Sequence, residues 1–178
     1  MYNDVDRVLF DEAAIQSRLR TLAETITADY QGKELAVVAI LNGSLIFAAD
    51  LLRHIPLPLT LQCLSVASYH GGTESSGTVT FNQLALPNLQ GKHVLILDDI
   101  LDSGLTLEAV SNRLAEAGKP ASVRICVLLQ KRKERIPAIA ADYVGFEIED
   151  EFVVGYGLDY QQRYRNFPFV GVLRSECS

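Results

Sequence analysis

The segment HVLILDDILDSGLTL, residues 93–107, joins an apolar run to a cluster of aspartates and then to a turn of small polar residues. Its first part, residues 93–99, is typical of a strand buried on both faces of a sheet. Apolar residues then recur at helical spacing from Leu107, and Gly118 ends the pattern. Ligands of open α/β sheets bind beyond the carboxyl ends of the strands. The segment therefore predicts a strand, a ligand-binding turn and a helix in succession.

The turn DSGLT, residues 102–106, has the composition of an anion-binding site. Gly104 allows the backbone to approach an anion closely. Backbone N–H groups at the start of the following helix attract phosphate, and the hydroxyls of Ser103 and Thr106 can donate hydrogen bonds. The turn lacks the lysine of the G-x-x-x-x-G-K-[ST] motif of nucleotide triphosphatases. We therefore expect a phosphate site of a different kind.

Asp98, Asp99 and Asp102 add carboxylates next to the predicted phosphate site. Carboxylates that close a strand can accept hydrogen bonds from sugar hydroxyls or help to hold Mg²⁺ through water. The alternative is an ordinary strand-to-helix turn in which Asp and Ser act as caps. Like charges this close repel one another unless a ligand or a cation accompanies them, which favours a binding site. A phosphate site, carboxylates that accept from sugar hydroxyls and a further carboxylate together suit a ribose 5-phosphate with a reacting sugar carbon.

Apolar strand-like runs and helical patterns alternate along the rest of the chain. One helix is predicted at residues 11–30, where Asp11 can cap its start, and a strand buried on both faces is predicted at 35–41. The other predicted elements are a helix at 45–52 and strands at 59–69, 79–86, 122–130 and 169–173. This alternation predicts an α/β fold with a mostly parallel central sheet flanked by helices. The length of 178 residues fits a single domain.

The composition argues against several classes of protein. A hydrophobic content of 48% disfavours disorder, and a net charge of −6 disfavours a broad nucleic-acid surface. The sequence predicts neither a secretory signal nor a membrane span, so we expect no membrane association. Cys63, Cys126 and Cys177 form no C-x-x-C motif, which favours reduced thiols in a cytoplasmic protein.

Four segments resemble, in order, those of the type I phosphoribosyltransferases. VLILDDILDSGLT, residues 94–106, resembles the phosphoribosyl-pyrophosphate motif of this family, and LNGS, residues 41–44, resembles its pyrophosphate loop. SYHGGTESSG, from Ser68, resembles its flexible active-site loop. LLQKR and the later stretch YVGFEIEDEFVVGYGLDYQQRYRN are similar to the purine-binding hood of hypoxanthine-guanine phosphoribosyltransferases. The resemblance extends from about Leu35 to Asn166.

The resemblance implies a purine salvage enzyme. Such an enzyme transfers ribose 5-phosphate from phosphoribosyl pyrophosphate to N9 of hypoxanthine and/or guanine, which gives IMP or GMP and pyrophosphate. Asp98 and Asp99 match the acids that hold the ribose hydroxyls, and Asp102 matches the carboxylate proposed as general base or acid near purine N7. The residues that match the 5'-phosphate cradle are Ser103, Gly104, Leu105 (through its backbone) and Thr106.

The resemblance also assigns pyrophosphate, metal and purine contacts. The residues that match the pyrophosphate site are Asn42, Gly43, Ser68, Tyr69 and Arg165. The residues that match the Mg²⁺ site are Asp98, Asp99 and Asp159. Mg²⁺ would neutralise the leaving pyrophosphate. Lys131 matches the donor to purine O6, Phe152 the aromatic ring that stacks on the base, and Val153 the residue whose carbonyl contacts the exocyclic edge of the base.

Some of these matches have simple alternatives or depart from the family pattern. Taken alone, Lys131 would belong to a solvated basic run, and Phe152 would belong to the core. Asn42 stands where many relatives have a basic residue, so it offers amide donors without a positive charge. Asp98 is one methylene shorter than the glutamate common at its place.

Two other functions stay open. One is an RNA-binding regulator of the same fold, which would need a basic face. The other is a phosphoribosyltransferase for xanthine or a pyrimidine, although Lys131 and Phe152 favour a 6-oxopurine. Hypoxanthine and guanine are not ranked by the sequence. The resemblance further implies a flexible loop near residues 68–80, a hood built mainly from 131–178, and a homodimer or homotetramer.

Overall fold

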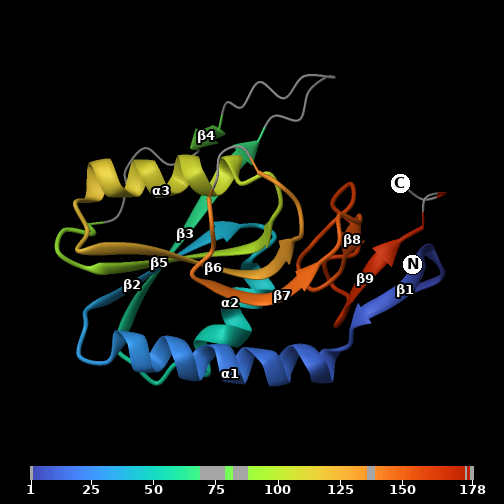
Figure 1. The fold of residues 1–178 in the computed structure, drawn as a ribbon, viewed down its shortest axis with the longest axis horizontal. Helices are drawn as coiled ribbons and strands as arrows, with labels where there is room; N and C mark the ends of the chain where they lie inside the picture. The colour runs from blue at the N-terminus through green and yellow to red at the C-terminus, as the bar shows by residue number, and fades with distance from the viewer. Residues whose placement is uncertain (1, 69–78, 82–87, 136–138, 175, 177–178) are drawn as a thin grey trace.

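A computed structural model of the chain describes residues 2–68, 79–81, 88–135, 139–174 and 176. It contains a six-stranded sheet between helices and a separate three-stranded sheet at one end of the molecule (Figure 1). The elements in chain order are η1 (Tyr2–Asp4), β1 (Val5–Phe10), α1 (Glu12–Tyr30), β2 (Leu35–Leu41), α2 (Leu45–Leu52), β3 (Leu59–Ser68), β4 (Val79–Phe81), β5 (His93–Leu101), α3 (Leu105–Gly118), β6 (Ser122–Lys131), β7 (Tyr143–Ile148), β8 (Val153–Val154) and β9 (Val170–Leu173).

The six-stranded sheet has the strand order β4-β3-β2-β5-β6-β7. Neighbouring strands from β3 to β7 pair in parallel, and the short strand β4 pairs antiparallel with β3 at the edge. This order confirms the predicted α/β fold with a mostly parallel central sheet. The parallel strands β2, β5 and β6 are neighbours, so their carboxyl ends meet at the same edge of the sheet.

Helices cover both faces of this sheet, with α1 and α2 on one face and α3 on the other (Figure 1). Successive side chains of a strand point to opposite faces. Val37 and Ala39 of β2 accordingly pack in the cluster under α1 and α2, whereas Ala36 and Val38 pack in the cluster under α3. The apolar run of β2 is therefore buried on both faces, as its sequence predicts.

Helix α1 begins where the sequence predicts. The Asp11 side chain accepts a hydrogen bond from the Ala14 N–H at 2.8 Å and so satisfies one of the free N–H groups of the first turn. The buried face of the helix consists of Ile15, Leu19, Leu22, Ala23, Ile26 and Tyr30. This spacing confirms the predicted amphipathic helix.

The three-stranded sheet has the order β1-β9-β8 and is antiparallel. We use the term hood for β1, β8, β9 and residues 155–169. Strand β1 was not predicted, because its largely exposed residues lack the alternation that indicates a half-buried strand. A small core of its own holds this sheet together, formed by Val5, Val154, Tyr164, Phe167 and Leu173. An N-terminal strand thus shares this sheet with two C-terminal strands.

One predicted strand end differs from the structure by more than one residue, and another lies outside the described residues. Strand β5 continues past Asp99 to Leu101, because Ile100 and Leu101 still pair with β6. Asp98 and Asp99 therefore lie within the strand, and only Asp102 lies beyond it. Of the predicted strand at 79–86, residues 79–81 form β4, and residues 82–87 lie outside the described residues.

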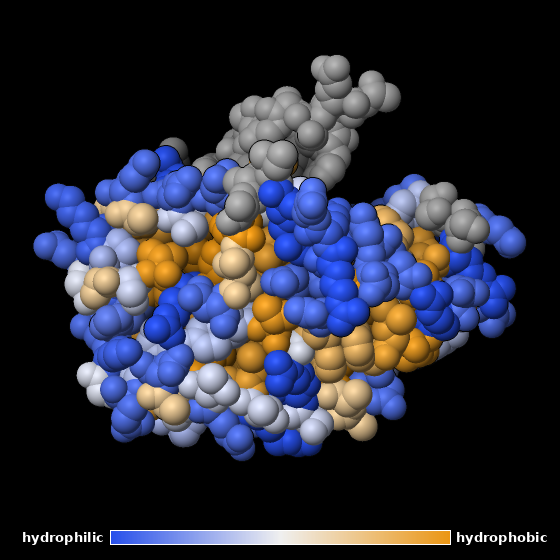
Figure 2. Space-filling view, viewed as in Figure 1, coloured by the Kyte–Doolittle hydropathy of each residue, from blue (hydrophilic) through white to orange (hydrophobic). Residues whose placement is uncertain are grey.

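The surface mixes polar and apolar residues. Figure 2 shows hydrophilic residues over the helical layers and apolar residues in the band between them. Among the helices that the structure describes, none is both long enough and apolar enough to cross a membrane.

Candidate active site

Two adjoining cavities lie at the carboxyl ends of the parallel strands. The larger cavity, about 480 Å³, is lined by the ends of β2 and β5, by the turn that begins α3, and by two hood residues. The smaller cavity, about 210 Å³, is lined by the end of β5, by Lys131 at the end of β6, by Glu151 and Phe152, and by three hood residues. The residues common to both linings are Asp99, Ile100, Asp102 and Asp159. A ligand can therefore extend from one cavity into the other.

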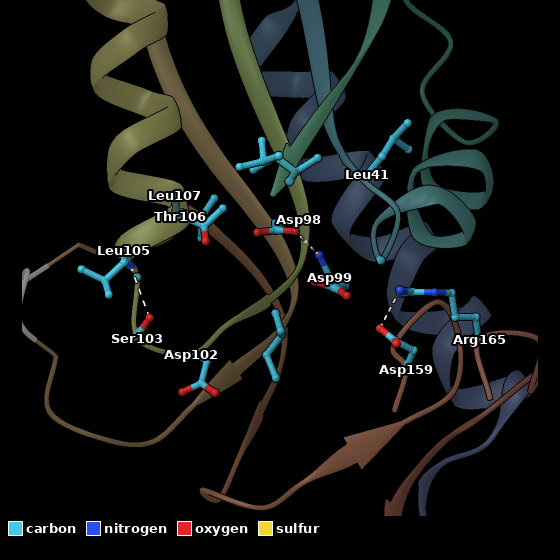
Figure 3. Close-up of a pocket in the computed structure, with 15 residues that line it drawn as sticks. Leu41, Asp98, Asp99, Asp102, Ser103, Leu105, Thr106, Leu107, Asp159 and Arg165 are labelled. Carbon is cyan, nitrogen blue, oxygen red and sulfur yellow. Dashed lines mark hydrogen bonds and ion pairs between the residues drawn. The ribbon is translucent and has the colours of Figure 1, made fainter. Parts of the chain in front are cut away.

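The turn before α3 forms one wall of the larger cavity (Figure 3). Gly104 has a φ of 87°, and a Cβ atom there would lie 2.4 Å from Ile139 Cγ2, so both conformation and space require glycine. Gly104 is also the N-cap residue of α3 and provides no side-chain cap. Ser103 Oγ lies 3.5 Å from the Leu105 nitrogen. The first turn of α3 thus faces the cavity, and its binding of an anion stays a prediction.

Asp98 and Asp99 form the floor of the larger cavity. Asp98 is 8% exposed, and its side chain accepts a hydrogen bond from the Asp99 N–H at 3.0 Å. Burial and the neighbouring Asp99 charge raise the pKa of Asp98 well above its ordinary value. Burial also raises the pKa of Asp99, although the positive charge of Arg165 opposes that change. Hydroxyl donors or a cation from a ligand would therefore stabilise the ionised pair.

The loop after β2 closely approaches Asp99. A Cβ atom on Gly43 would lie 1.7 Å from Asp99 Oδ2, so any larger residue would displace the carboxylate. The peptide bond between Leu41 and Asn42 is cis. Leu41 and Gly43 line the larger cavity, whereas Asn42 is exposed and lies outside its described lining. The structure thus brings Gly43 to the predicted pyrophosphate site, but not the side chain of Asn42.

Asp159 and Arg165 lie across the larger cavity from the phosphate turn (Figure 3). Arg165 Nη2 is 2.6 Å from Asp159 Oδ1, and Arg165 Nη1 donates to the Gly157 carbonyl at 2.7 Å. These contacts orient the guanidinium group at the cavity wall. The two residues that the sequence placed near pyrophosphate therefore lie together, one cationic and one anionic.

The smaller cavity contains the three residues predicted to contact a purine. Val153 is buried, and Lys131 is 9% exposed. Phe152 is 48% exposed, so it is not a core residue. It packs edge-on against Tyr160, with ring centroids 5.6 Å apart. An exposed ring beside a cavity is suited to contact a planar ligand.

Lys131 and Asp102 pair with each other and with further charged residues. Lys131 Nζ lies 3.0 Å from Asp102 Oδ2 and 2.8 Å from Asp150 Oδ1, and Lys133 Nζ contacts Asp102 Oδ1. Partial burial opposes ionisation of Asp102, but the hydrogen bonds from Lys133 and Lys131 outweigh it and lower its pKa. Burial likewise opposes protonation of Lys131, yet the hydrogen bonds that Lys131 donates to Asp150 and Asp102 raise its pKa. Both groups are therefore charged at neutral pH.

Lys133 and Arg135 belong to the basic run after β6, and sequence reasoning assigned them no role. Arg135 Nε donates to the Asp102 carbonyl at 2.8 Å, and its Nη2 contacts the carbonyls of Leu101 and Lys131. Arg135 thus joins the ends of β5 and β6. Because β6 ends at Lys131 and the chain bends at Lys133, no strand periodicity indicated these contacts.

Part of the predicted site lies outside the described residues. Tyr69 is one such residue, as are most residues of the loop predicted near 68–80. The backbone of Ser68 ends β3, but its side chain is not described. The predicted contacts of Ser68 and Tyr69 with pyrophosphate stay predictions.

The carboxylates present fit Mg²⁺ that arrives with a phosphate ligand. Among the described residues, no group of three or more His, Cys, Asp or Glu side chains is arranged to hold a metal ion. Asp98, Asp99 and Asp159 nevertheless line one cavity, and oxygen ligands suit Mg²⁺. Protein sites for this ion commonly supply one or two carboxylates and leave the other positions to water and substrate phosphates.

The chain resembles known proteins over almost its whole length. A family model described as the phosphoribosyl transferase domain matches residues 8–161. The chain is 45% identical over 176 residues to a hypoxanthine-guanine phosphoribosyltransferase of Staphylococcus aureus, with 99% of this chain and 98% of the relative covered. It is 43% identical over 174 residues to one from Streptococcus pneumoniae, with 98% and 96% covered. A crystal structure of a hypoxanthine phosphoribosyltransferase from Staphylococcus aureus matches with a TM-score of 0.92 and 45% identity, over 99% of this chain and 95% of that one.

Proposed function

The chain belongs to the phosphoribosyltransferase family, among the hypoxanthine-guanine phosphoribosyltransferases, and on this premise we propose how its site performs the reaction. The enzyme transfers ribose 5-phosphate from phosphoribosyl pyrophosphate to N9 of hypoxanthine and/or guanine in purine salvage. The observation that supports this most directly is the pair of adjoining cavities, which meet at Asp102. One has phosphate-binding features, and the other has an aromatic ring and a lysine.

Phosphoribosyl pyrophosphate occupies the larger cavity. Its 5'-phosphate binds the turn of Ser103, Gly104, Leu105 and Thr106, where the first turn of α3 offers N–H donors. The ribose hydroxyls donate to Asp98 and Asp99 at the floor. The pyrophosphate lies toward Gly43 and Arg165, where a forked guanidinium can contact two oxygens.

The purine occupies the smaller cavity. Phe152 contacts the face of the ring, Lys131 donates to O6, and Val153 contacts the exocyclic edge through its backbone carbonyl. This orientation directs N9 toward the larger cavity and the sugar carbon C1'. Because the lysine is paired with carboxylates before the base binds, the base must offer an acceptor that replaces part of this pairing.

Asp102 is suited to handle the purine proton at the boundary of the cavities. The bond between C1' and the pyrophosphate oxygen breaks, the bond between C1' and N9 forms, and the proton on the purine leaves to the Asp102 carboxylate. The lowered pKa keeps Asp102 ionised at neutral pH and therefore able to accept the proton. Lys131 and Lys133 hold the carboxylate in place until the base arrives.

Mg²⁺, when bound, neutralises the charge of the leaving pyrophosphate. Asp98, Asp99 and Asp159 are the residues that would hold it, directly or through water. The same carboxylates orient the ribose and exclude alternative placements of the sugar.

A spectrophotometric assay tests this proposal. Pure protein, phosphoribosyl pyrophosphate and Mg²⁺ are mixed in turn with hypoxanthine, guanine, xanthine and adenine. Turnover of hypoxanthine or guanine with release of pyrophosphate is expected. Turnover of xanthine alone would instead favour a phosphoribosyltransferase for a different base, and salt-sensitive RNA binding without turnover would favour the RNA-binding regulator.

The sequence also bears on the location and assembly of the enzyme. The cysteine pattern supports a cytoplasmic location, and Cys126 is a buried thiol whose pKa burial raises. We expect a homodimer or homotetramer, with neither a nucleic-acid nor a membrane partner. Light scattering on the purified protein measures the number of subunits.

A further inference from the structure

Tyr156 lies in the hood close to the larger cavity, in an unusual backbone conformation. Its φ of 52° falls in the left-handed region, and its neighbours Gly155 and Gly157 have φ values of 99° and 104°. Glycine adopts positive φ readily, whereas an L side chain does so at a cost. The side chain of Tyr156 must therefore make contacts that offset this cost.

These contacts join the hood to the helical layer beneath the sheet. The Tyr156 side chain is buried, with the residue 3% exposed, and its hydroxyl donates to Asp50 Oδ2 on α2. Gln16 Nε2 on α1 donates to the same oxygen at 2.8 Å and lies 3.2 Å from the Tyr156 hydroxyl. We call Gln16, Asp50 and Tyr156 the Tyr156 anchor. Hydrogen bonds to an ionised carboxylate are stronger than neutral ones, so the anchor fixes the hood firmly on α2.

The backbone next to Tyr156 contacts the loop at the end of β2. A Cβ atom on Gly157 would lie 2.0 Å from the Gly43 carbonyl oxygen, so the two backbones are in direct contact. Gly157 also exchanges hydrogen bonds with Arg165, because its N–H donates to the Arg165 carbonyl at 2.9 Å and its carbonyl accepts from Nη1 at 2.7 Å. Gly157 therefore contacts both the loop and the arginine of the larger cavity.

The anchor adds a second point of attachment between the same two parts of the molecule. Helix α2 begins at Leu45, two residues after Gly43, so Asp50 and Gly43 move together. Gly157 rests on Gly43, and Tyr156 is bonded to Asp50. Two points fix the orientation of the hood segment as well as its distance from the loop.

We propose that Tyr156 is a positioning residue for the pyrophosphate half of the substrate. Through Asp50 it holds residues 157–159 in register with Gly43, so that Asp159 and Arg165 face the leaving group. The purine half depends on Lys131, Phe152 and Val153, and the described side-chain hydrogen bonds of the anchor do not include these residues. This inference rests on the proposed function, and it goes beyond it by naming a residue that lies outside both cavities.

Tyr156→Phe tests the proposal because it removes only the hydroxyl and keeps the ring. The KM for phosphoribosyl pyrophosphate should rise about tenfold, as expected for the loss of a hydrogen bond to a charged group. The KM for hypoxanthine should stay within about twofold. The Kd for magnesium pyrophosphate, measured by calorimetry, should rise by about the same factor as the KM for phosphoribosyl pyrophosphate.

Tyr164→Phe is a matched control. Tyr164 also lies in the hood, is 4% exposed, has a φ of 75°, and donates its hydroxyl to Asp4 Oδ2 at 3.0 Å. Asp4 belongs to the N-terminal turn η1 rather than to α2. Both variants should lower Tm by several degrees. Only Tyr156→Phe should weaken pyrophosphate binding.

Asp50 variants test the same contact from the other side. Asp50→Asn keeps an acceptor oxygen for Tyr156, so the KM for phosphoribosyl pyrophosphate should rise by no more than about threefold. Asp50→Ala removes the acceptor and should behave like Tyr156→Phe. These variants also give the answer if Tyr156→Phe does not fold.

The proposal is overturned if Tyr156→Phe and Asp50→Ala leave the Kd for magnesium pyrophosphate unchanged. It is also overturned if Tyr164→Phe raises the Kd for magnesium pyrophosphate as much as Tyr156→Phe does, because the effect would then come from hood stability alone. Wild-type protein without turnover would overturn the proposed function. The calorimetric comparison requires no turnover, so it would still support or overturn the role of Tyr156.

Discussion

The Lys131 ammonium lies 3.0 Å from the Asp102 carboxylate, at the boundary between the two cavities. Without a base, the two charges satisfy each other. A 6-oxopurine offers an acceptor for Lys131 and a proton for Asp102, so it can replace their mutual contact. Binding of the base and release of the carboxylate for proton transfer are therefore linked through this ion pair.

Asp102→Asn should remove the proton acceptor and keep the shape of the site. We expect kcat to fall by about 10²–10⁴-fold, equivalent to about 3–5 kcal/mol. Binding of phosphoribosyl pyrophosphate should stay nearly intact, because Asp102 is not required for the phosphate itself. Steady-state kinetics and calorimetry measure the two effects.

Asp150→Asn is the control for this variant. Asp150 contacts Lys131 at 2.8 Å but is exposed and lines neither described cavity. Its kcat should stay within about threefold of wild type, since exposed ion pairs contribute little. An Asp102→Asn enzyme with kcat within threefold of wild type would reject the role of Asp102.

The lowered pKa of Asp102 predicts a defined dependence of stability on pH. A carboxyl with a depressed pKa in the folded state stabilises the protein above its unfolded-state pKa, about 3.9, and this stabilisation is lost as pH falls through the folded-state value. The stability difference between wild type and Asp102→Asn, from urea unfolding, should therefore shrink between pH 5 and pH 3. Lys133→Met removes one partner of Asp102 and so raises the folded-state pKa of Asp102. In a Lys133→Met background, the stability difference caused by Asp102→Asn should therefore depend less on pH. A difference that grows as pH falls would contradict the ion pairing.

Gly157→Ala should disturb the pyrophosphate site. A Cβ atom there would lie 2.0 Å from the Gly43 carbonyl oxygen, whereas one on Gly91, whose φ is 74°, would have nothing within 4 Å. Both substitutions place an alanine at positive φ, at a cost of about 1–2 kcal/mol. Only Gly157→Ala should also raise the KM for phosphoribosyl pyrophosphate, by about tenfold or more. Equal KM values for the two variants would show that the backbone contact is unimportant.

Activity should depend on Mg²⁺. Asp98 and Asp99 are adjacent, buried carboxylates in the larger cavity, and Asp159 faces the same space. Excess chelator should abolish turnover, and added Mg²⁺ should restore it. Full turnover in excess chelator would contradict this expectation.

The strand end and turn that line the larger cavity could be predicted from sequence because their residues are contiguous. Asp98, Asp102 and Gly104 lie on one strand and the turn that follows, and the register of β5 fixes their placement. The parallel sheet and α1 could be predicted for a similar reason, since periodicity and the Asp11 cap are local signals.

The remaining features depend on contacts between distant segments. Tyr156 and Asp50 are 106 residues apart, and local periodicity provides no information on such a pairing. Strand β1 belongs to the hood because it pairs with β9, at the other end of the chain. Lys133 and Arg135 contact the end of β5 only after the chain has turned at the end of β6.

Lys131→Ala should reduce selectivity at purine position 6. The Lys131 ammonium is a permanent hydrogen-bond donor and can donate to the O6 acceptor of hypoxanthine or guanine. Adenine presents an amino group at this position, which is itself a donor. An unsatisfied buried charge costs on the order of 1–3 kcal/mol or more, about ten- to hundredfold or more in kcat/KM. Adenine should therefore be a poor substrate of the wild type.

Lys131→Ala should lose selectivity mainly because kcat/KM for the 6-oxopurines falls. Lys133→Met removes only the other partner of Asp102, so it should keep the selectivity of the wild type. Values of kcat/KM for hypoxanthine, guanine and adenine test whether Lys131 contacts purine position 6. Full selectivity in Lys131→Ala would mean that another residue contacts this position.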